Sequence, residues 1–348
     1  MLKINRGFTA PTLAVMLALV GPALSGAESR HAYSVSHTLE VGGTGGWDYV
    51  TVDSEHGLLY LPRSTHTIVL EDGTGKLAAD IPGQTRNHGV AVVPGIGRGF
   101  ITDGKDASVI IFDLKDYKVL GKVKAADDAD GIVYDPASGK LLVVCGDAGQ
   151  LVPIRADVDP TAGQPDAAVD LGGKPEFLAV DGKGKAYVDL IDKNEVAVVD
   201  TKTMKVVARW PTAPGGAPTG MAIDPVGRRL FIGCRKPQKL IVMSADDGKV
   251  LASLPIGAGV DADGFDDGNI FASCGDGTLS IARETAPGDF KIVQTVKTRP
   301  GSRTMGVDSR NHAVFLPSAD FEPKSAKGGR PTMKPGTFKI LVVTPAPK

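Results

Sequence analysis

Apolar and polar residues alternate with a period of two along most of this chain, and turns rich in Gly, Asp and Pro interrupt the alternation at short intervals. This pattern is typical of short antiparallel β-strands. A longer period of about 42 residues is superimposed on it, because seven segments each open with a polar turn and continue as an apolar strand that ends in Asp or Pro. They read GWDYVTVD (46–53), NHGVAVVP (87–94), ADGIVYDP (129–136), PEFLAVDG (175–182), PTGMAIDP (218–225), VDADGFDD (260–267) and RTMGVDSR (303–310).

Repeats of this length that contain only strands predict the blades of a β-propeller. We therefore expect an all-β fold, a seven-bladed β-propeller of four-stranded antiparallel blades, in a single domain over residues 28–348. In the fifth repeat the strands are predicted at 220–224, 229–233, 239–243 and 250–254. The last repeat has no room for a fourth strand, so we expect the N-terminal segment 36–41 to complete it and to close the ring.

One side chain of each repeat occupies an equivalent position near the start of the first strand. Successive members of this set, the ring positions, are separated by 40, 42, 46, 43, 42 and 42 residues. They are Asp48, His88, Asp130, Glu176, Thr219, Asp261 and Arg303. We expect them to surround the central channel and to form a ligand-binding site. Arg303 is expected to pair with Asp48 or with Asp261, its neighbours in the ring.

Carboxylates that crowd a narrow channel repel one another unless protons or cations balance them. Asp48, Asp130, Glu176 and Asp261 offer hard oxygen ligands, so a divalent cation is one expected occupant. If the channel is catalytic, His88 and Glu176 are the candidate bases. Polar groups at strand starts can equally cap backbone groups or hold channel water, and such roles need no ligand.

The second strands of the blades end in another set of charged residues, which we interpret as solvated turn residues. The alternative is a polar funnel above the ring. The set comprises Arg63, Asp103, Asp147, Asp189, Arg235 and Asp276.

Three cysteines are present, and Cys234 and Cys274 are the one pair placed to form a disulfide, because both end the second strands of adjacent blades. Neighbouring blades fan apart, so we favour small buried thiols at these two positions and at Cys145. Residues 320–336, rich in Pro, Gly and Lys, are expected to form an exposed loop in the last blade. Both a cover over one face and an insertion without function remain open for this loop.

The N-terminal residues predict export. Lys3 and Arg6 precede an apolar run over 8–20, and small residues follow at 23–27. This is the pattern of a cleaved signal peptide, here 1–27, and the apolar run is short for a membrane span. We expect a periplasmic or secreted protein with no stable membrane insertion after cleavage.

Charge and aromatic content argue against nucleic acid as a partner. The chain has 39 basic and 40 acidic residues and 5% aromatics, which provides neither a basic surface nor a set of stacking platforms. The expected partners are a small molecule or another protein of the cell envelope.

The segments WDYVTVD, NHGVAVVP, PTGMAIDP and GDGTLS, with turns of the form DxxTxKV, resemble the YVTN or YncE-like seven-bladed propellers of bacterial envelopes. The resemblance covers about residues 35–345 and implies an exported propeller. Its wider superfamily includes lactonases, haem d1-type and quinoprotein subunits, and binding scaffolds. Our leading interpretation is a ligand- or cation-binding scaffold rather than an enzyme. The alternatives are a metal-dependent lactonase-type hydrolase or lyase, and a redox-accessory subunit that holds a haem- or quinone-type cofactor with His88 as the axial candidate.

Overall fold

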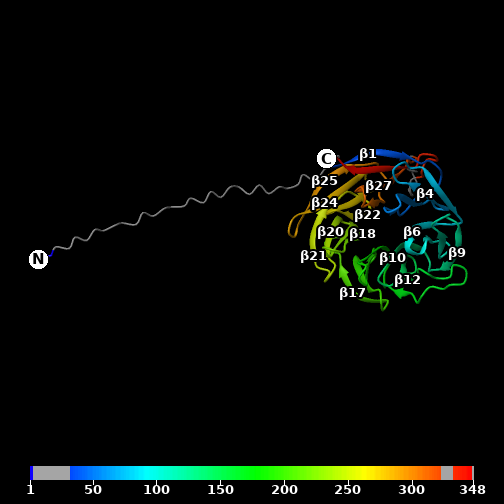
Figure 1. The fold of residues 1–348 in the computed structure, drawn as a ribbon, viewed down its shortest axis with the longest axis horizontal. Coiled ribbons are helices and arrows are strands. Elements are labelled where there is room, and N and C mark those ends of the chain that lie inside the picture. The colour runs from blue at the N-terminus through cyan, green and yellow to red at the C-terminus, as the bar shows by residue number, and fades with distance from the viewer. Residues whose placement is uncertain (3–31, 323–331, 347–348) are drawn as a thin grey trace. The chain divides into compact units, whose positions relative to one another are not determined.

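The computed structural model describes residues 1–2, 32–322 and 332–346. Between residues 32 and 346, the described chain forms seven sheets of four antiparallel strands that follow one another around a channel (Figure 1). The predicted all-β propeller is therefore confirmed. In six of the blades, four consecutive strands run in chain order from the channel outwards.

The strands of the first four blades are as follows. Blade 1 holds β2 (Thr51–Asp53), β3 (Leu58–Pro62), β4 (His66–Glu71) and β5 (Leu77–Pro82). Blade 2 holds β6 (Asn87–Val93), β7 (Arg98–Asp103), β8 (Ser108–Asp113) and β9 (Val119–Lys124), with the short 3₁₀ turn η1 (Pro94–Ile96) after β6. Blade 3 holds β10 (Ala129–Asp135), β11 (Lys140–Cys145), β12 (Gln150–Arg155) and β13 (Val169–Asp170). Blade 4 holds β14 (Pro175–Val180), β15 (Lys185–Leu190), β16 (Glu195–Asp200) and β17 (Lys205–Pro211).

The remaining strands complete the ring. Blade 5 holds β18 (Pro218–Asp224), β19 (Arg229–Arg235), β20 (Gln238–Ser244) and β21 (Val250–Pro255), each of which contains the strand predicted for the fifth repeat. Blade 6 holds β22 (Val260–Asp266), β23 (Asn269–Cys274), β24 (Thr278–Ala286) and β25 (Asp289–Lys297). Blade 7 holds β26 (Gly306–Asp308), β27 (Ala313–Ser318), β28 (Lys339–Pro345) and the N-terminal strand β1 (Tyr33–Glu40).

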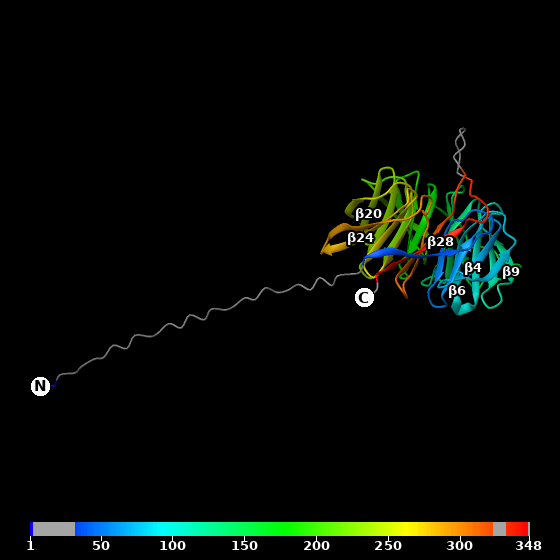
Figure 2. The same cartoon turned by 90° about the horizontal axis from the view of Figure 1, so that it is seen from above.

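The two ends of the described propeller chain close the ring in one sheet, as predicted. Strand β1 pairs with β28 in antiparallel register from Tyr33 opposite Pro345 to Glu40 opposite Lys339 (Figure 2). The side-chain amide of Gln294, from β25 of blade 6, also contacts the start of β1. It accepts from the backbone N–H of Tyr33 at 2.9 Å and donates to the Tyr33 carbonyl at 2.7 Å. Blade 6 therefore holds the strand that completes blade 7.

The apolar core lies between the blades rather than in the channel. Phe100 and Ile111 of blade 2, for example, pack in one buried cluster with Leu141 and Val152 of blade 3. Fully burying a side chain of this kind contributes about 1.5–3 kcal/mol, so these interfaces hold the fold together. The inner ends of the blades are consequently free to carry polar side chains.

The Asp that ends most inner strands has a structural role in the following turn. Asp135 accepts from the N–H of Ala137 at 3.2 Å, Asp224 from Val226 at 3.0 Å, and Asp308 from Arg310 at 2.9 Å. A short carboxylate side chain satisfies turn N–H groups in this way. These recurring Asp residues therefore shape the repeat, and the ring positions are separate from them.

Arg63 corrects one interpretation made from the sequence. Its side chain is buried, not solvated, and donates to the carbonyls of Thr44 at 2.9 Å and Gly45 at 3.0 Å. Its guanidinium lies over the ring of Phe338 with its central carbon 3.7 Å from the ring centroid. A cation on an aromatic face together with carbonyl acceptors offsets the cost of burying the charge. Arg63 therefore ties the entry turn of blade 1 to blade 7.

The cysteines and the loop of the last blade complete the comparison with the expectations. Cys145, Cys234 and Cys274 are buried free thiols, as favoured from the sequence. In segment 320–336, Phe321 forms a β-bridge with Met333, and its ring centroid lies 6.0 Å from that of Trp47. Residues 323–331 of the predicted loop and residues 3–27 of the predicted signal peptide lie outside the described residues. Within the described part of the chain, no helix is long and apolar enough to span a membrane.

Candidate functional site

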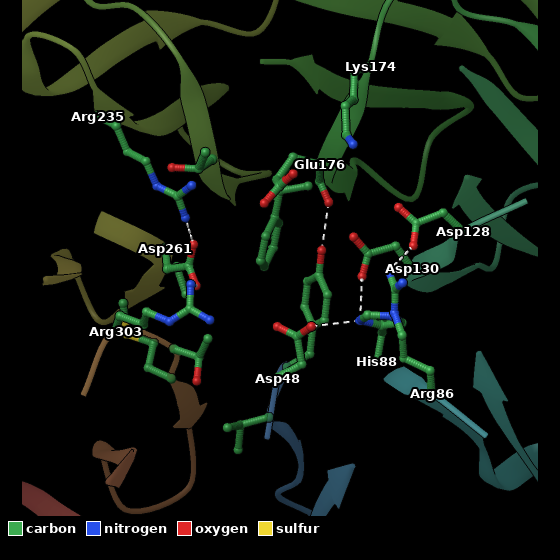
Figure 3. Close-up of a pocket in the computed structure, with 17 residues that line it drawn as sticks. Asp48, Arg86, His88, Asp128, Asp130, Lys174, Glu176, Arg235, Asp261 and Arg303 are labelled. Atoms are coloured by element: carbon green, nitrogen blue, oxygen red, sulfur yellow. Dashed lines mark hydrogen bonds and ion pairs between the residues drawn. The ribbon is translucent and has the colours of Figure 1, made fainter. Parts of the chain in front are cut away.

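All seven ring positions line one cavity of about 540 Å³ at the centre of the propeller. The sequence thus identified correctly which side chains the blades bring together: Asp48, His88, Asp130, Glu176, Thr219, Asp261 and Arg303. Figure 3 shows most of them converging from different blades.

A β-bulge explains why these particular side chains reach the channel. In blades 2 to 6 the pairing between the first two strands shifts register at the ring position, for example between Ala129 and Ile132 around Asp130, and between Pro175 and Leu178 around Glu176. The same shift occurs in β6, β18 and β22. A bulge releases a residue from the ladder and redirects its side chain. In blades 1 and 7 the ring position precedes the first strand, with the same effect.

His88 is the centre of a hydrogen-bonded cluster. Its Nδ1 lies 2.7 Å from Oδ2 of Asp48 and 3.3 Å from Oδ1 of Asp130. On the other side of the ring, Nε of Arg86 donates to Nε2 of His88 at 3.1 Å. Because a guanidinium can only donate, Nε2 must accept, and the proton of a neutral imidazole then lies on Nδ1 between the two carboxylates. Arg86 also forms an ion pair with Asp128.

Two glycines allow this cluster to pack against the strands behind it. A Cβ atom on Gly104 would lie 3.0 Å from Nε2 of His88, and one on Gly146 would lie 2.8 Å from a carboxylate oxygen of Asp128. Both distances are too short for ordinary side-chain contacts, so the glycines make room for the close approach of polar groups.

Burial and mutual repulsion raise the pKa values of two acids of the cavity, Asp130 and Glu176. Burial, and then the charges of Asp48 and Glu176, raise the pKa of Asp130 well above its usual value. Burial also raises the pKa of Glu176, although Arg235 and Lys174 oppose that shift. Displacements of this kind are typical of sites that bind ligands or transfer protons.

The opposite side of the cavity carries two arginines on one carboxylate. Asp261 is 7% exposed and forms ion pairs with Arg235 and with Nη1 of Arg303, the latter at 2.5 Å. Arg303 therefore pairs with Asp261, the second of the two partners considered from the sequence. The hydroxyl of Thr219, the neighbouring ring position, donates a hydrogen bond to the backbone carbonyl of Val260 at 3.0 Å. The role of this side chain is therefore structural.

Tyr49 joins two blades across the cavity. Its hydroxyl, from blade 1, donates to the backbone carbonyl of Glu176 in blade 4 at 2.6 Å, and its ring centroid lies 5.1 Å from that of Phe177. A second cavity of about 400 Å³, lined largely by apolar residues of the inner strands, shares Val50 and Met305 with the first. Tyr49 and Phe177 line only the polar cavity.

Four charged residues of the cavity were not among the predicted ring positions: Arg86, Asp128, Lys174 and Arg235. Three of them stand two residues before His88, Asp130 and Glu176, and each directly precedes the first strand of its blade. The equivalent residues in the other four blades are Gly46, Ala217, Gly259 and Gly301, so this second tier is charged in blades 2 to 4 alone. That asymmetry is visible in the sequence once the ring is aligned.

The residues that end the second strands have mixed roles. Arg235 lines the cavity, as the funnel interpretation expected. Asp103 and Asp189 are buried and accept backbone N–H groups, from Thr85 and Phe177, both at 2.6 Å, so their interpretation as solvated residues was wrong. Asp147 is an exposed partner of Lys174, and Asp276 accepts from the N–H of Ala258 at 2.7 Å.

Comparison with known proteins supports the fold. No family model and no curated protein matches the chain. The structure is similar to a chain of hydrazine synthase from Kuenenia stuttgartiensis, with a TM-score of 0.66 and 13% identity, covering 81% of this chain and 94% of that one. It is also similar to the β-propeller domain of Cps50 (Swd1) from Myceliophteria thermophila, with a TM-score of 0.65 and 11% identity, covering 87% and 98%. At these identities the likeness shows the propeller fold alone.

Proposed function

We propose that this propeller is a binding protein whose central cavity takes a small polar ligand. The main support is that one side chain from each of the seven blades converges on a single cavity. Charged residues that precede the first strands of three blades, Arg86, Asp128 and Lys174, line the same cavity. Five carboxylates and four cationic side chains line it. A fold stabilised by packing between blades does not need these charges in its channel, and placing them there costs desolvation energy.

The dimensions and the rigidity of the cavity support this proposal. Its volume of about 540 Å³ lies in the range of small-molecule sites. Hydrogen bonds hold several of its polar groups before any ligand enters, as with His88 between Asp48 and Arg86. Such preorganisation lowers the entropy cost of binding.

We further propose that the protein works in the bacterial cell envelope as a YVTN or YncE-like propeller. The support is the signal-peptide pattern over 1–27 and the blade motifs quoted above. Cell fractionation with N-terminal sequencing of the mature chain tests this part: a start at residue 28 is expected, and an intact cytoplasmic chain would overturn it.

Thermal unfolding in the presence of chemically distinct small molecules tests the binding function. The panel contains sugars, carboxylic acids, amines, amino acids and divalent cations. A ligand at one hundred times its dissociation constant stabilises the folded state by about 2.7 kcal/mol. The matched control is the double variant Glu176→Gln with Arg303→Gln, which removes both charges while each position keeps a polar side chain. Stabilisation of the wild type but not of the variant is expected, and equal responses would place binding elsewhere.

The second candidate is the metal-dependent hydrolase or lyase, which one observation favours. Ligand atoms of Asp48, His88 and Asp130 lie within 4.8 Å of one another, a spacing that suits a divalent cation. The donor set fits a cation if Nδ1 of His88 gives up its proton. Nε2 would then take that proton and the hydrogen bond from Arg86 would break. When bound, the cation would polarise a substrate carbonyl, and Glu176 would be the base within the cavity.

The redox alternative gains less support from this geometry. Both ring nitrogens of His88, the proposed axial ligand, already have side-chain partners in Asp48 and Arg86. A haem- or quinone-type cofactor would require those contacts to rearrange, and the colour of the purified protein tests for it directly.

A further inference from the structure

The charges of the central cavity are divided into two sectors. Arg235 and Arg303 lie on one side with Asp261, and His88 and Asp130 lie on the other (Figure 3). The division follows the order of the blades, because the ring positions of blades 1 to 4 are acidic or His, whereas Arg235 and Arg303 come from blades 5 and 7. The two cations of the acidic side, Arg86 and Lys174, form ion pairs with Asp128 and Asp147.

The arginine sector carries an excess of positive charge. Two guanidinium groups share the one carboxylate of Asp261. The side chain of Arg303 is 38% exposed and reaches Asp261 through Nη1. Among the described residues, Asp261 is the ion-pair partner found for Arg303, so further guanidinium N–H groups remain to donate to a ligand. A planar carboxylate is the natural acceptor for such a fork of donors.

The acidic sector carries an excess of acceptors. Asp48 uses Oδ2 for His88, and Glu176 projects from blade 4 into the same space without a hydrogen bond from another described side chain. Lys174 of the same blade forms an ion pair with Asp147 at 3.0 Å, and the charge of Arg235 acts on Glu176 from blade 5. Asp48 and Glu176 can therefore accept hydrogen bonds from an ammonium group.

From this division we infer that the ligand is a zwitterion, with its carboxylate on Arg303 and its ammonium group between Asp48 and Glu176. The inference rests on the proposed binding function and specifies the ligand class. A free amino acid and a short peptide both present these two groups, at different separations. The cavity orients such a molecule because its own charges form a complementary dipole.

Neither a simple acid nor a simple amine matches the cavity equally well. The second carboxylate of a diacid would face Asp48 and Glu176, and the second ammonium group of a diamine would face Arg303. Juxtaposed like charges discriminate strongly against such ligands. The charge pattern thus provides selectivity as well as affinity.

Isothermal titration with molecules of matched length tests the inference. The probes are ω-amino acids from glycine to aminooctanoate, each compared with the diacid and the diamine of the same chain length. This series covers the short charge separation of an amino acid and the longer one of a peptide. We expect at least one ω-amino acid to bind about tenfold or more tightly than its diacid and diamine. The length of the ω-amino acid that binds most tightly then shows whether the charge separation is that of a free amino acid or that of a short peptide.

Two single variants test which cavity residue binds the carboxylate of the ligand and which binds its ammonium group. Arg303→Gln should weaken the best ω-amino acid about thirtyfold or more, because a charged partner is lost, while improving the affinity of the diamine of that length. Asp48→Asn should weaken the same ω-amino acid and improve the diacid, and its amide oxygen can still accept from His88. Asp261 keeps Arg235 in the first variant, so the fold should survive, and unfolding curves check this.

The outcomes separate this inference from the proposed function. If diacids or diamines bind as tightly as ω-amino acids, or Arg303→Gln leaves the preference unchanged, the zwitterion inference is overturned and the binding function stands. If no ω-amino acid binds but another class of the panel above does, the same conclusion follows. If nothing in either set binds, both fail.

Discussion

The Nε atom of Arg86 donates a hydrogen bond to Nε2 of His88 across 3.1 Å, and this contact determines which ring nitrogen carries the proton. Asp48 then accepts from Nδ1–H on the far side of the ring, and Oδ1 of Asp130 lies 3.3 Å from the same nitrogen. Three blades meet at this imidazole, since Asp48, His88 and Asp130 come from blades 1, 2 and 3. The cluster therefore joins neighbouring blades and also forms one wall of the cavity.

The first prediction concerns this tautomer. Nitrogen NMR of ring-labelled protein at neutral pH should show His88 with its proton on Nδ1. Replacement Arg86→Met removes the donor to Nε2 but should leave the proton on Nδ1, because the carboxylate of Asp48 still accepts from it. A wild-type signal with the proton on Nε2 would contradict the arrangement, and the His88→Gln variant assigns the resonance.

The second prediction tests whether ligand binding needs the room that Gly104 leaves beside His88. A glycine substitution elsewhere serves as the control. A Cβ on Gly104 would lie 3.0 Å from Nε2 of His88, whereas one on Gly73 would have no neighbour within 4 Å. Gly104→Ala should weaken the best ligand of the panel at least about tenfold, because His88 and Arg86 must separate. Gly73→Ala should leave binding and the melting temperature nearly unchanged. Equal behaviour of the two variants would show that the close approach is unimportant.

The third prediction concerns pH and Asp189. Burial raises the pKa of this carboxyl from 3.8 to about 8, and it accepts from the N–H of Phe177 at 2.6 Å. A carboxyl with a raised folded-state pKa favours folding fully below the unfolded value, and its contribution is lost as pH rises through the folded value. Unfolding free energy should therefore fall between about pH 4 and pH 8, with a slope from this group approaching 1.4 kcal/mol per pH unit.

Denaturant titrations of wild type and Asp189→Asn across that pH range measure this slope. The variant keeps a hydrogen-bond acceptor for Phe177 and cannot ionise, so its stability should depend less on pH than that of the wild type. Parallel curves for the two proteins would show that Asp189 does not bind a proton in the folded state.

The fourth prediction tests ring closure. Gln294 bonds both backbone groups of Tyr33, at 2.9 and 2.7 Å, and so fixes the strand that completes blade 7. Gln294→Ala should lower the free energy of unfolding by about 1–3 kcal/mol, since two polar groups of the backbone lose their partner. The exposed neighbour Thr295 provides the control, because Thr295→Ala removes no such contact. Similar losses of unfolding free energy in both variants would show that the hydrogen bonds between Gln294 and Tyr33 add no stability.

The fifth prediction distinguishes the two candidate functions by metal content. If the cavity is a metal centre, elemental analysis should find one divalent cation per chain, lost in Asp130→Asn and retained in Glu176→Gln. If it is a binding site for small polar molecules, chelator treatment should change neither the melting temperature nor the response to ligand. A chelator-sensitive response to ligand would favour the hydrolase candidate.

Much of this architecture could be predicted from the sequence because each blade repeats one pattern. The inner strand of every repeat ends in a turn, often with an Asp such as Asp135 or Asp224 that accepts turn N–H groups, and these residues set the alignment. Once aligned, the repeats identified all seven ring positions that line the cavity. Segment 36–41 reads as a strand that belongs to no repeat, and the last repeat lacks a fourth strand, so the closure of the ring could also be predicted.

What could not be predicted depends on contacts between blades. Arg63 and Asp103 have the same local pattern as exposed turn residues, and only the neighbouring segments bury them. The choice of Asp261 over Asp48 as partner of Arg303 also depends on side-chain directions that a repeat alignment lacks. Arg86 and Lys174 could not be recognised from the repeat pattern, because the position two residues before the ring position is charged in three of the seven blades.

Recovery of a small molecule from the intact protein tests the central claim most directly. Wild type and the Glu176→Gln, Arg303→Gln double variant are incubated with a bacterial small-molecule extract, washed by ultrafiltration and denatured, and the released compounds are identified by mass spectrometry. We predict that the wild type retains about one equivalent of a polar compound and that the variant releases little of it. Retention of the same compounds in equal amounts by both proteins, or of none by either, would contradict a ligand site in the central cavity.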